Sequence, residues 1–357
     1  MRAAGGLAAL ALALALAACS TPTTRMISQP GQTLGGAEAR YLPASEPRSA
    51  DGSLILRSAT DPTGLSIAIS SLHYASAPAV VLAPTTSDPE ALELADNYGI
   101  PVLALPPDAA AEQEGAVAQE VARLGASLVL PVGMEAPAEV VSATELAGEP
   151  GALKLPPAAD AAPASPWVAL VPDEETAATI TPLADREGGM VVVAPEPRAS
   201  GEAVTALAEN PEATVVAFGE GFPDEANLTW QVDTARTGVR LPGGDTQTIA
   251  DGKFYVALYG HPGAPVLGVL GEQGVEATVA RAEEHAAMFD DLTEATTVPS
   301  LEIIVSVASA FPGSDGNYSN EVPSSHFMPL IEAAHEHDLY VIIDLQPGRT
   351  DFLTQAK

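Results

Sequence analysis

Six short runs of apolar, mostly β-branched residues constrain the fold of this 357-residue chain more than any other feature. The runs are Ala79–Ala83, Val102–Leu105, Ser127–Leu130, Trp167–Val171, Met190–Ala194 and Thr214–Phe218. Helical stretches separate them, and the runs do not alternate polar with apolar residues. Continuous apolar runs suit strands that are covered on both faces, and their alternation with helices is typical of parallel sheets. The sequence therefore predicts an α/β fold.

These runs form two triplets that resemble each other. Pro84 and Pro172 follow the first run of each triplet at a spacing of 88, and Gly133 and Gly219 follow the third at a spacing of 86. A near-constant spacing predicts an internal repeat of two three-layer α/β units, residues 53–145 and 167–250. Residues 146–166 between them are rich in Pro and Ala, which suits a linker rather than a helix or a sheet.

A third region, residues 251–357, has the rhythm of a (β/α) barrel. Strands are expected at 254–260, 301–307 and 339–345, with helices at 275–292 and 327–338 and long loops after the strands. Successive β-α-β units place such strands side by side in chain order. A full barrel takes about 250 residues, so we expect a truncated barrel-like segment, with further strands beyond the sequence given.

The N-terminus has the features of a bacterial export signal. Arg2 precedes an unbroken Leu/Ala stretch, 7–18, which is too short to span a bilayer. The sequence Leu16-Ala17-Ala18-Cys19 resembles the lipobox of bacterial lipoproteins. This resemblance implies a signal peptide at 1–18, cleavage before Cys19 and a diacylglyceryl anchor on that cysteine at the extracytoplasmic face of the cell membrane. The alternative is an ordinary signal peptide. Residues 19–52 are expected to form a flexible stalk.

Composition excludes some classes of partner. Cys19 is the only cysteine, so an intramolecular disulfide is impossible. The net charge of −32 repels nucleic acid, and we expect no nucleic-acid partner. No phosphate loop, dinucleotide fingerprint or metalloprotease motif is present, so no cofactor is expected.

Two family resemblances follow from these motifs. The segments Ala79–Ala83, Gly99–Ala104 and Leu124–Gly133 resemble the bacterial cell-wall-binding repeat of type 2, which implies a wall polymer as partner. That family usually shows three copies and a basic surface, whereas this chain has two copies and is acidic. The motifs Tyr259–Pro262 and Asp344–Arg349 resemble the barrel-like C-terminal domain of actinobacterial lipoproteins.

Catalytic candidates come from position, because barrel active sites lie where strands end. The residues at these strand ends are Tyr259, His261, Ser306, Asp315, Tyr318, Asp344, Gln346 and Arg349. Asp344 is the best of them, since burial at the end of an apolar strand would favour its protonated form and suit proton transfer. Tyr259, His261 and Arg349 complete the candidate set. The alternatives are a salt bridge from Asp344 to Arg349 or a loop cap for Asp344, and a simple turn around His261–Gly263 for Tyr259 and His261.

The cluster His335-Glu336-His337-Asp338 invites comparison with a metal site, but it closes a helix and matches no standard zinc spacing. We interpret it as a solvated helix end and expect no metal.

Three functions remain open. The first is a cell-envelope lipoprotein with a wall-binding module and a binding or structural role. The second is a glycan hydrolase of the envelope with its site on the barrel loops. The third is a solute-binding lipoprotein of a transporter.

Overall fold

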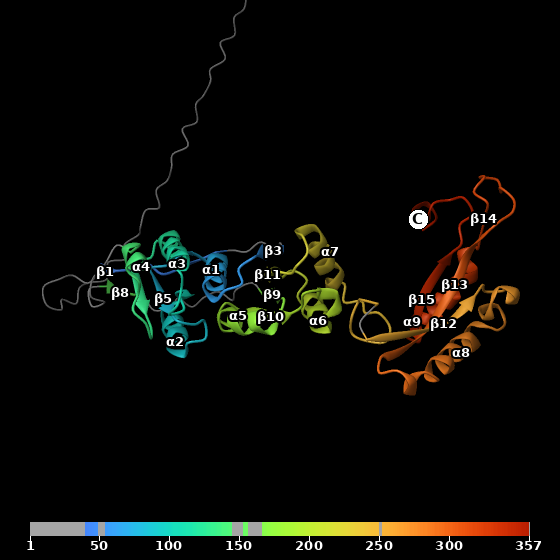
Figure 1. The fold of residues 1–357 in the computed structure, drawn as a ribbon, viewed down its shortest axis with the longest axis horizontal. Helices are drawn as coiled ribbons and strands as arrows, with labels where there is room; N and C mark the ends of the chain where they lie inside the picture. Colours follow the sequence, from blue (N-terminus) through green and yellow to red (C-terminus); the bar gives the residue numbers. More distant parts are fainter. Residues whose placement is uncertain (1–39, 49–53, 145–152, 156–165, 250–251, 357) are drawn as a thin grey trace, which may run out of the picture.

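The computed structural model describes residues 40–48, 54–144, 153–155, 166–249 and 252–356 (Figure 1). It has the expected α/β fold, with helices packed against largely parallel sheets. Cys19 and the predicted signal peptide, residues 1–18, lie outside the described residues. Within the described part of the chain, each helix is too short or too polar to cross a bilayer.

The first unit is a three-stranded parallel sheet in the order β6-β5-β7. Its strands are β5 (Ala79–Ala83), β6 (Val102–Ala104) and β7 (Leu128–Pro131), and its helices are α1 (Pro62–His73), α2 (Pro89–Tyr98), α3 (Ala111–Leu124) and α4 (Ala138–Ser142). Every residue of β5 is buried, as a central strand with both faces covered requires. Asp61 and Asp88 cap α1 and α2 by accepting hydrogen bonds from backbone N–H groups of the first turn.

The second unit repeats this plan with the order β10-β9-β11. Its strands are β9 (Trp167–Val171), β10 (Gly189–Val193) and β11 (Thr214–Phe218), and its helices are α5 (Glu174–Arg186), the short η2 (Pro197–Ala199), α6 (Gly201–Glu209) and α7 (Glu225–Arg236). The central strands β5 and β9 occupy equivalent places, which confirms the predicted repeat.

The matched prolines and glycines have a structural reason. Gly133 and Gly219, which follow the third strands, have φ of +66° and +95°, values that side chains with a Cβ rarely adopt. A Cβ at Gly219 would lie 3.1 Å from the ring of Pro172, and one at Gly133 would face Pro84 at 3.9 Å. In both units the chain therefore turns against the proline that ends the central strand.

The two units share one hydrophobic core. It contains Leu65, Ile69 and Ile100 from the first unit together with Trp167 and Phe218 from the second. Polar pairs border this contact: the Tyr74 hydroxyl donates to Glu187 at 2.7 Å, and Arg186 Nε donates to Asp96 at 2.5 Å. The cavity beside these side chains is only about 10 Å³.

Short strands cross the boundaries expected from sequence. Strand β3 (Leu54–Arg57), predicted to belong to the first repeat, pairs in parallel with β11 of the second. Within the predicted stalk, β1 (Arg40–Tyr41) pairs with β8 (Leu153–Lys154) of the predicted linker, and β2 (Glu46–Pro47) pairs with β4 (Tyr74–Ser76). The expected boundaries are wrong here, because an open sheet edge can recruit any nearby strand.

The C-terminal region contains the three predicted strands as parallel neighbours in chain order: β12 (Lys253–Gly260), β13 (Thr296–Ala308) and β15 (Tyr340–Leu345). Short β14 (Ser319–Glu321) adds an antiparallel pairing at the end of β13. The helical segments are η3 (Pro265–Leu267), η4 (Val269–Gly271), α8 (Val275–Ala287), η5 (Asp290–Leu292), α9 (Ser324–Glu336) and α10 (Phe352–Ala356).

One face of this sheet packs against α8 and α9. Leu258, Leu301 and Ile303 point toward these helices and form a core with Val279 and Leu330. Because side chains alternate along a strand, the intervening residues lie on the opposite face.

Candidate functional site

The sheet face opposite to α8 and α9 is rich in tyrosine and acid. Counting by twos from the helix-facing positions places the following side chains there: Tyr255 and Tyr259 from β12, Glu302 and Ser306 from β13, and Tyr340 and Asp344 from β15. The rings of Tyr255 and Tyr340 contact each other with centroids 4.9 Å apart. Tyrosines and carboxylates are thus gathered on one surface of three adjacent strands.

Tyr259, Asp344 and Gln346 form a hydrogen-bonded cluster at the C-terminal ends of the strands. The Tyr259 hydroxyl donates to Asp344 Oδ2 at 3.3 Å, and Gln346 Nε2 donates to the same carboxylate oxygen at 2.8 Å. Gln346 Nε2 also lies 3.0 Å from the Tyr259 hydroxyl oxygen. The two catalytic candidates Tyr259 and Asp344 therefore lie within hydrogen-bonding distance of each other.

The environment of Tyr259 favours its neutral form. Desolvation is the first cause and the Asp344 carboxylate the second, and together they raise the pKa of the Tyr259 phenol. Asp344 itself is only half-buried, whereas the sequence predicted that an apolar strand would bury it. The expectation was wrong because β15 pairs only with β13 among the described strands and is an edge strand, on which even Ile343 of the helix side is 43% exposed. The cluster is accessible, and its phenol serves as a hydrogen-bond donor.

Glu302 is a member of this face that the sequence reasoning missed. It lies opposite Tyr259 in the β12–β13 register, and its charge also raises the pKa of Tyr259. An acid inside the apolar run Leu301–Val307 was the available signal, since Glu302 has the same parity as Ser306.

Ser306 is buried next to the cluster and holds its backbone in place. It is 2% exposed, and its hydroxyl oxygen accepts hydrogen bonds from the Gln346 backbone N–H at 3.1 Å and from Gln355 Nε2 at 2.8 Å. These bonds fix the backbone that positions the Gln346 side chain. Ser306 is thus a positioning residue and does not itself face solvent.

Arg349 takes a different place from the one predicted. Its guanidinium lies 4.2 Å from the ring centroid of Tyr318, and its backbone N–H donates to Asn317 O at 2.8 Å. The side chains of the described residues show no ion pair between Arg349 and Asp344, so the salt-bridge alternative is wrong. Asp315 accepts from the Asn317 N–H and shapes the same loop.

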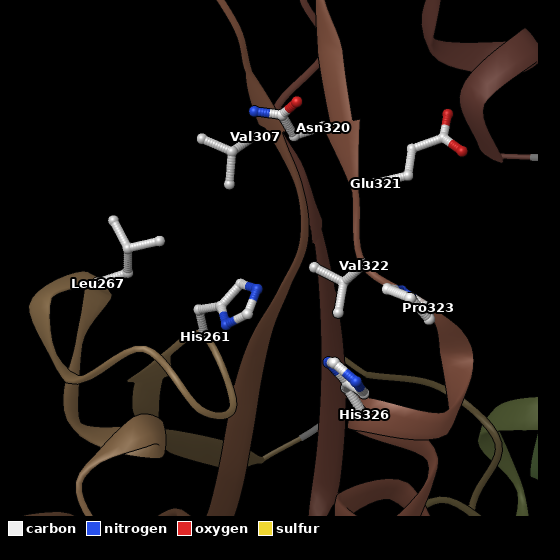
Figure 2. Close-up of a pocket in the computed structure, with 8 residues that line it drawn as sticks. All are labelled: His261, Leu267, Val307, Asn320, Glu321, Val322, Pro323 and His326. Atoms are coloured by element: carbon white, nitrogen blue, oxygen red, sulfur yellow. The ribbon is translucent and has the colours of Figure 1, made fainter.

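His261 lines a separate cavity of about 330 Å³ together with residues of β14 and the first turn of α9 (Figure 2). Its polar lining is His261, Asn320, Glu321 and His326, and its apolar lining is Leu267, Val307, Val322 and Pro323. Figure 2 shows the Glu321 carboxylate turned away from His261, on the other side of β14. The structure therefore separates His261 from the Tyr259–Asp344 cluster, although only one residue intervenes between Tyr259 and His261.

The histidines at the end of α9, His335 and His337, lie away from both the Tyr259–Asp344 cluster and the cavity that His261 lines. His337 Nδ1 is 3.3 Å from Glu283 of α8, at the helix end that precedes β15. Among the residues that the structure describes, no three His, Cys, Asp or Glu side chains are grouped so as to hold a metal ion.

Comparisons with known proteins add no further constraint: no protein family, curated protein or solved structure matches this chain.

Proposed function

We propose that the chain is a cell-envelope lipoprotein that binds a wall glycan through the C-terminal sheet. The observation that carries this proposal is the accessible Tyr259–Asp344–Gln346 cluster at the strand ends. It combines an aromatic ring with a carboxylate and an amide, the groups that fix and orient a polyhydroxylated ligand.

Charge favours a neutral ligand of this kind. The net charge of −32 repels phosphate-rich polymers, while sugar hydroxyls can donate to Asp344 without an electrostatic penalty. The Tyr259 side chain is 40% exposed, so its ring is free to contact the apolar face of a sugar. The lipobox-like segment at Cys19 supports the cell envelope as the location of the protein. The resemblance to wall-binding repeats supports a wall polymer as its partner.

The test is co-sedimentation of the full chain with insoluble, delipidated cell-wall glycan. Tyr259→Ala and Asp344→Asn should each weaken binding about tenfold, which corresponds to the loss of one charged hydrogen bond or one ring contact. Asp351→Asn is the matched control, because Asp351 bonds only within its own exposed turn. Unchanged binding by both cluster variants, or equal loss in the control, would contradict the proposal.

A hydrolase is the second candidate, and one observation favours it. Asp344 and Glu302 lie on adjacent strands of one face, and both carboxylates act on the pKa of Tyr259. Glycoside hydrolysis uses such a pair of carboxylates. New reducing ends released from wall glycan by the full chain, and abolished in both Asp344→Asn and Glu302→Gln, would establish this activity over simple binding.

The third function considered, solute binding between two lobes, finds no support in the geometry. A ligand of that class would occupy a crevice between the α/β units, where Leu65, Ile69, Trp167 and Phe218 instead pack into one core.

A further inference from the structure

The cavity beside β14 differs in character from the sheet face. Leu267, Val307 and Val322 give it apolar walls, and His261, Asn320 and His326 supply polar groups. In Figure 2 the two imidazoles approach Val322 from different sides, and the Asn320 amide lies near Val307. About 330 Å³ is at the low end for a ligand pocket and suits a single ring with a small substituent.

His261 supplies a second, independent observation. Its Nδ1 atom is buried and has no hydrogen-bond partner among the described residues. A buried polar atom without a partner is costly, and the cost disappears when a ligand provides the missing bond. Nδ1 itself has almost no accessible surface, so the imidazole ring must turn before a ligand in the cavity can bond to this atom.

The lining selects the chemistry of that ligand. Asn320 can both donate to and accept from an amide, and either imidazole can bond to a hydroxyl or a carbonyl. The apolar walls suit a methyl group but provide no partner for a further charge. The acidic surface disfavours an anion. An acetamido group on a sugar ring combines the amide, the methyl and the hydroxyls.

We propose that this cavity binds one N-acetylated amino sugar, separately from the Tyr259–Asp344 face. The inference rests on the proposed glycan function for its biological setting, and it names the sugar class that gives specificity. The polymer would contact the sheet face, while an N-acetylated residue or chain end occupies the cavity.

The experiment is a titration of the full chain with N-acetylglucosamine, followed by NMR of the histidine ring protons. The chain has six histidines, so the spectrum is simple. We expect the His261 and His326 signals to shift and saturate, while those of His73 and His285 stay fixed. Glucose and glucosamine, which lack the acetamido group, should bind at least tenfold more weakly.

Two variants make the test specific. Leu267→Trp fills the cavity from a position that is 38% exposed, so it should abolish the shifts without unfolding the chain. His261→Phe removes the unpaired nitrogen while keeping a ring, and should weaken binding roughly fivefold. Asp344→Asn should leave the monosaccharide shifts intact even where it reduces sedimentation with wall glycan.

The outcomes separate the two proposals. Absence of saturable shifts, equal binding of glucose, or unchanged binding by Leu267→Trp overturns the inference about the cavity, whatever the wall-glycan assay shows. Saturable binding of N-acetylglucosamine without any binding to wall glycan would keep the cavity as an amino-sugar site and refute the polymer proposal.

Discussion

Acid should destabilise the paired α/β units through one buried imidazole. His73 ends α1, and its ring contacts Trp167 of the other unit with centroids 5.0 Å apart. Burial lowers the pKa of His73 from 6.5 to about 4, and its Nε2 atom has no hydrogen-bond partner in the described structure. The unfolded chain therefore takes up a proton below pH 6.5, whereas the folded chain does so only near pH 4.

The sign and size of the effect follow from this difference. As pH falls from 6.5 to 4, the unfolded state binds more protons, so the free energy of unfolding decreases. A shift of that size corresponds to about 3 kcal/mol. Glu187 acts in the opposite direction, because burial raises its pKa and its folded form is protonated first. The Glu187 contribution is present in both the parent chain and His73→Phe. The difference between their pH dependences of the unfolding free energy is therefore the contribution of His73.

The assay is urea unfolding followed by far-ultraviolet circular dichroism at pH 7 and pH 4.5. The parent chain should lose about 2 to 3 kcal/mol more than His73→Phe between these values. His285→Phe is the matched control, since His285 is an exposed helix residue and its replacement should leave the pH dependence unchanged. Equal acid sensitivity of the parent chain and His73→Phe would refute the reasoning.

Three further changes test the fold and the cluster. Gly189→Ala should lower the free energy of unfolding by about 1 to 3 kcal/mol in urea unfolding, because its Cβ would lie 2.4 Å from the Trp167 ring. The control, Gly274→Ala, has open space around it and should leave the stability unchanged. Arg186→Leu should lower the free energy of unfolding by at least about 1 kcal/mol, since it removes the hydrogen bonds to Asp96 and to the Ile100 carbonyl that join the two units. Unchanged stability of this variant would contradict a stabilising role for these bonds. Asp344→Asn should lower the pKa of Tyr259 in an NMR titration, and an unchanged or higher value would show that the carboxylate has no influence.

The predicted strands were the part of the fold that sequence could specify. Runs such as Ala79–Ala83 and Trp167–Val171 are apolar on both faces, and only a central strand covered on both sides accommodates them. The partner of β3 could not be specified in this way. Leu54–Arg57 is a short apolar run next to the first unit, and its pairing with β11 depends on which sheet edge lies nearby in three dimensions.

The candidate site was predicted in part for a similar reason. The rule that barrel sites lie at strand ends was enough to bring Tyr259 and Asp344 together. It did not distinguish the two sides of the sheet, so it grouped His261 with them. Strand β14 was missed because Ser319–Glu321 has no apolar pattern, yet this strand forms one wall of the cavity. Arg349 was misplaced because its loop turns it onto Tyr318.

The connection between the two parts of the molecule explains why both proposed sites remain open. The chain before β12 contacts the C-terminal sheet at the N-terminal ends of its strands: Gly243 packs against Val298, and its N–H donates to Asp338 just before β15. Tyr259, Asp344 and His261 lie at the other ends of the same strands. Because the attachment uses the N-terminal ends of the strands, it leaves the C-terminal ends uncovered, as the proposed binding of a polymer requires.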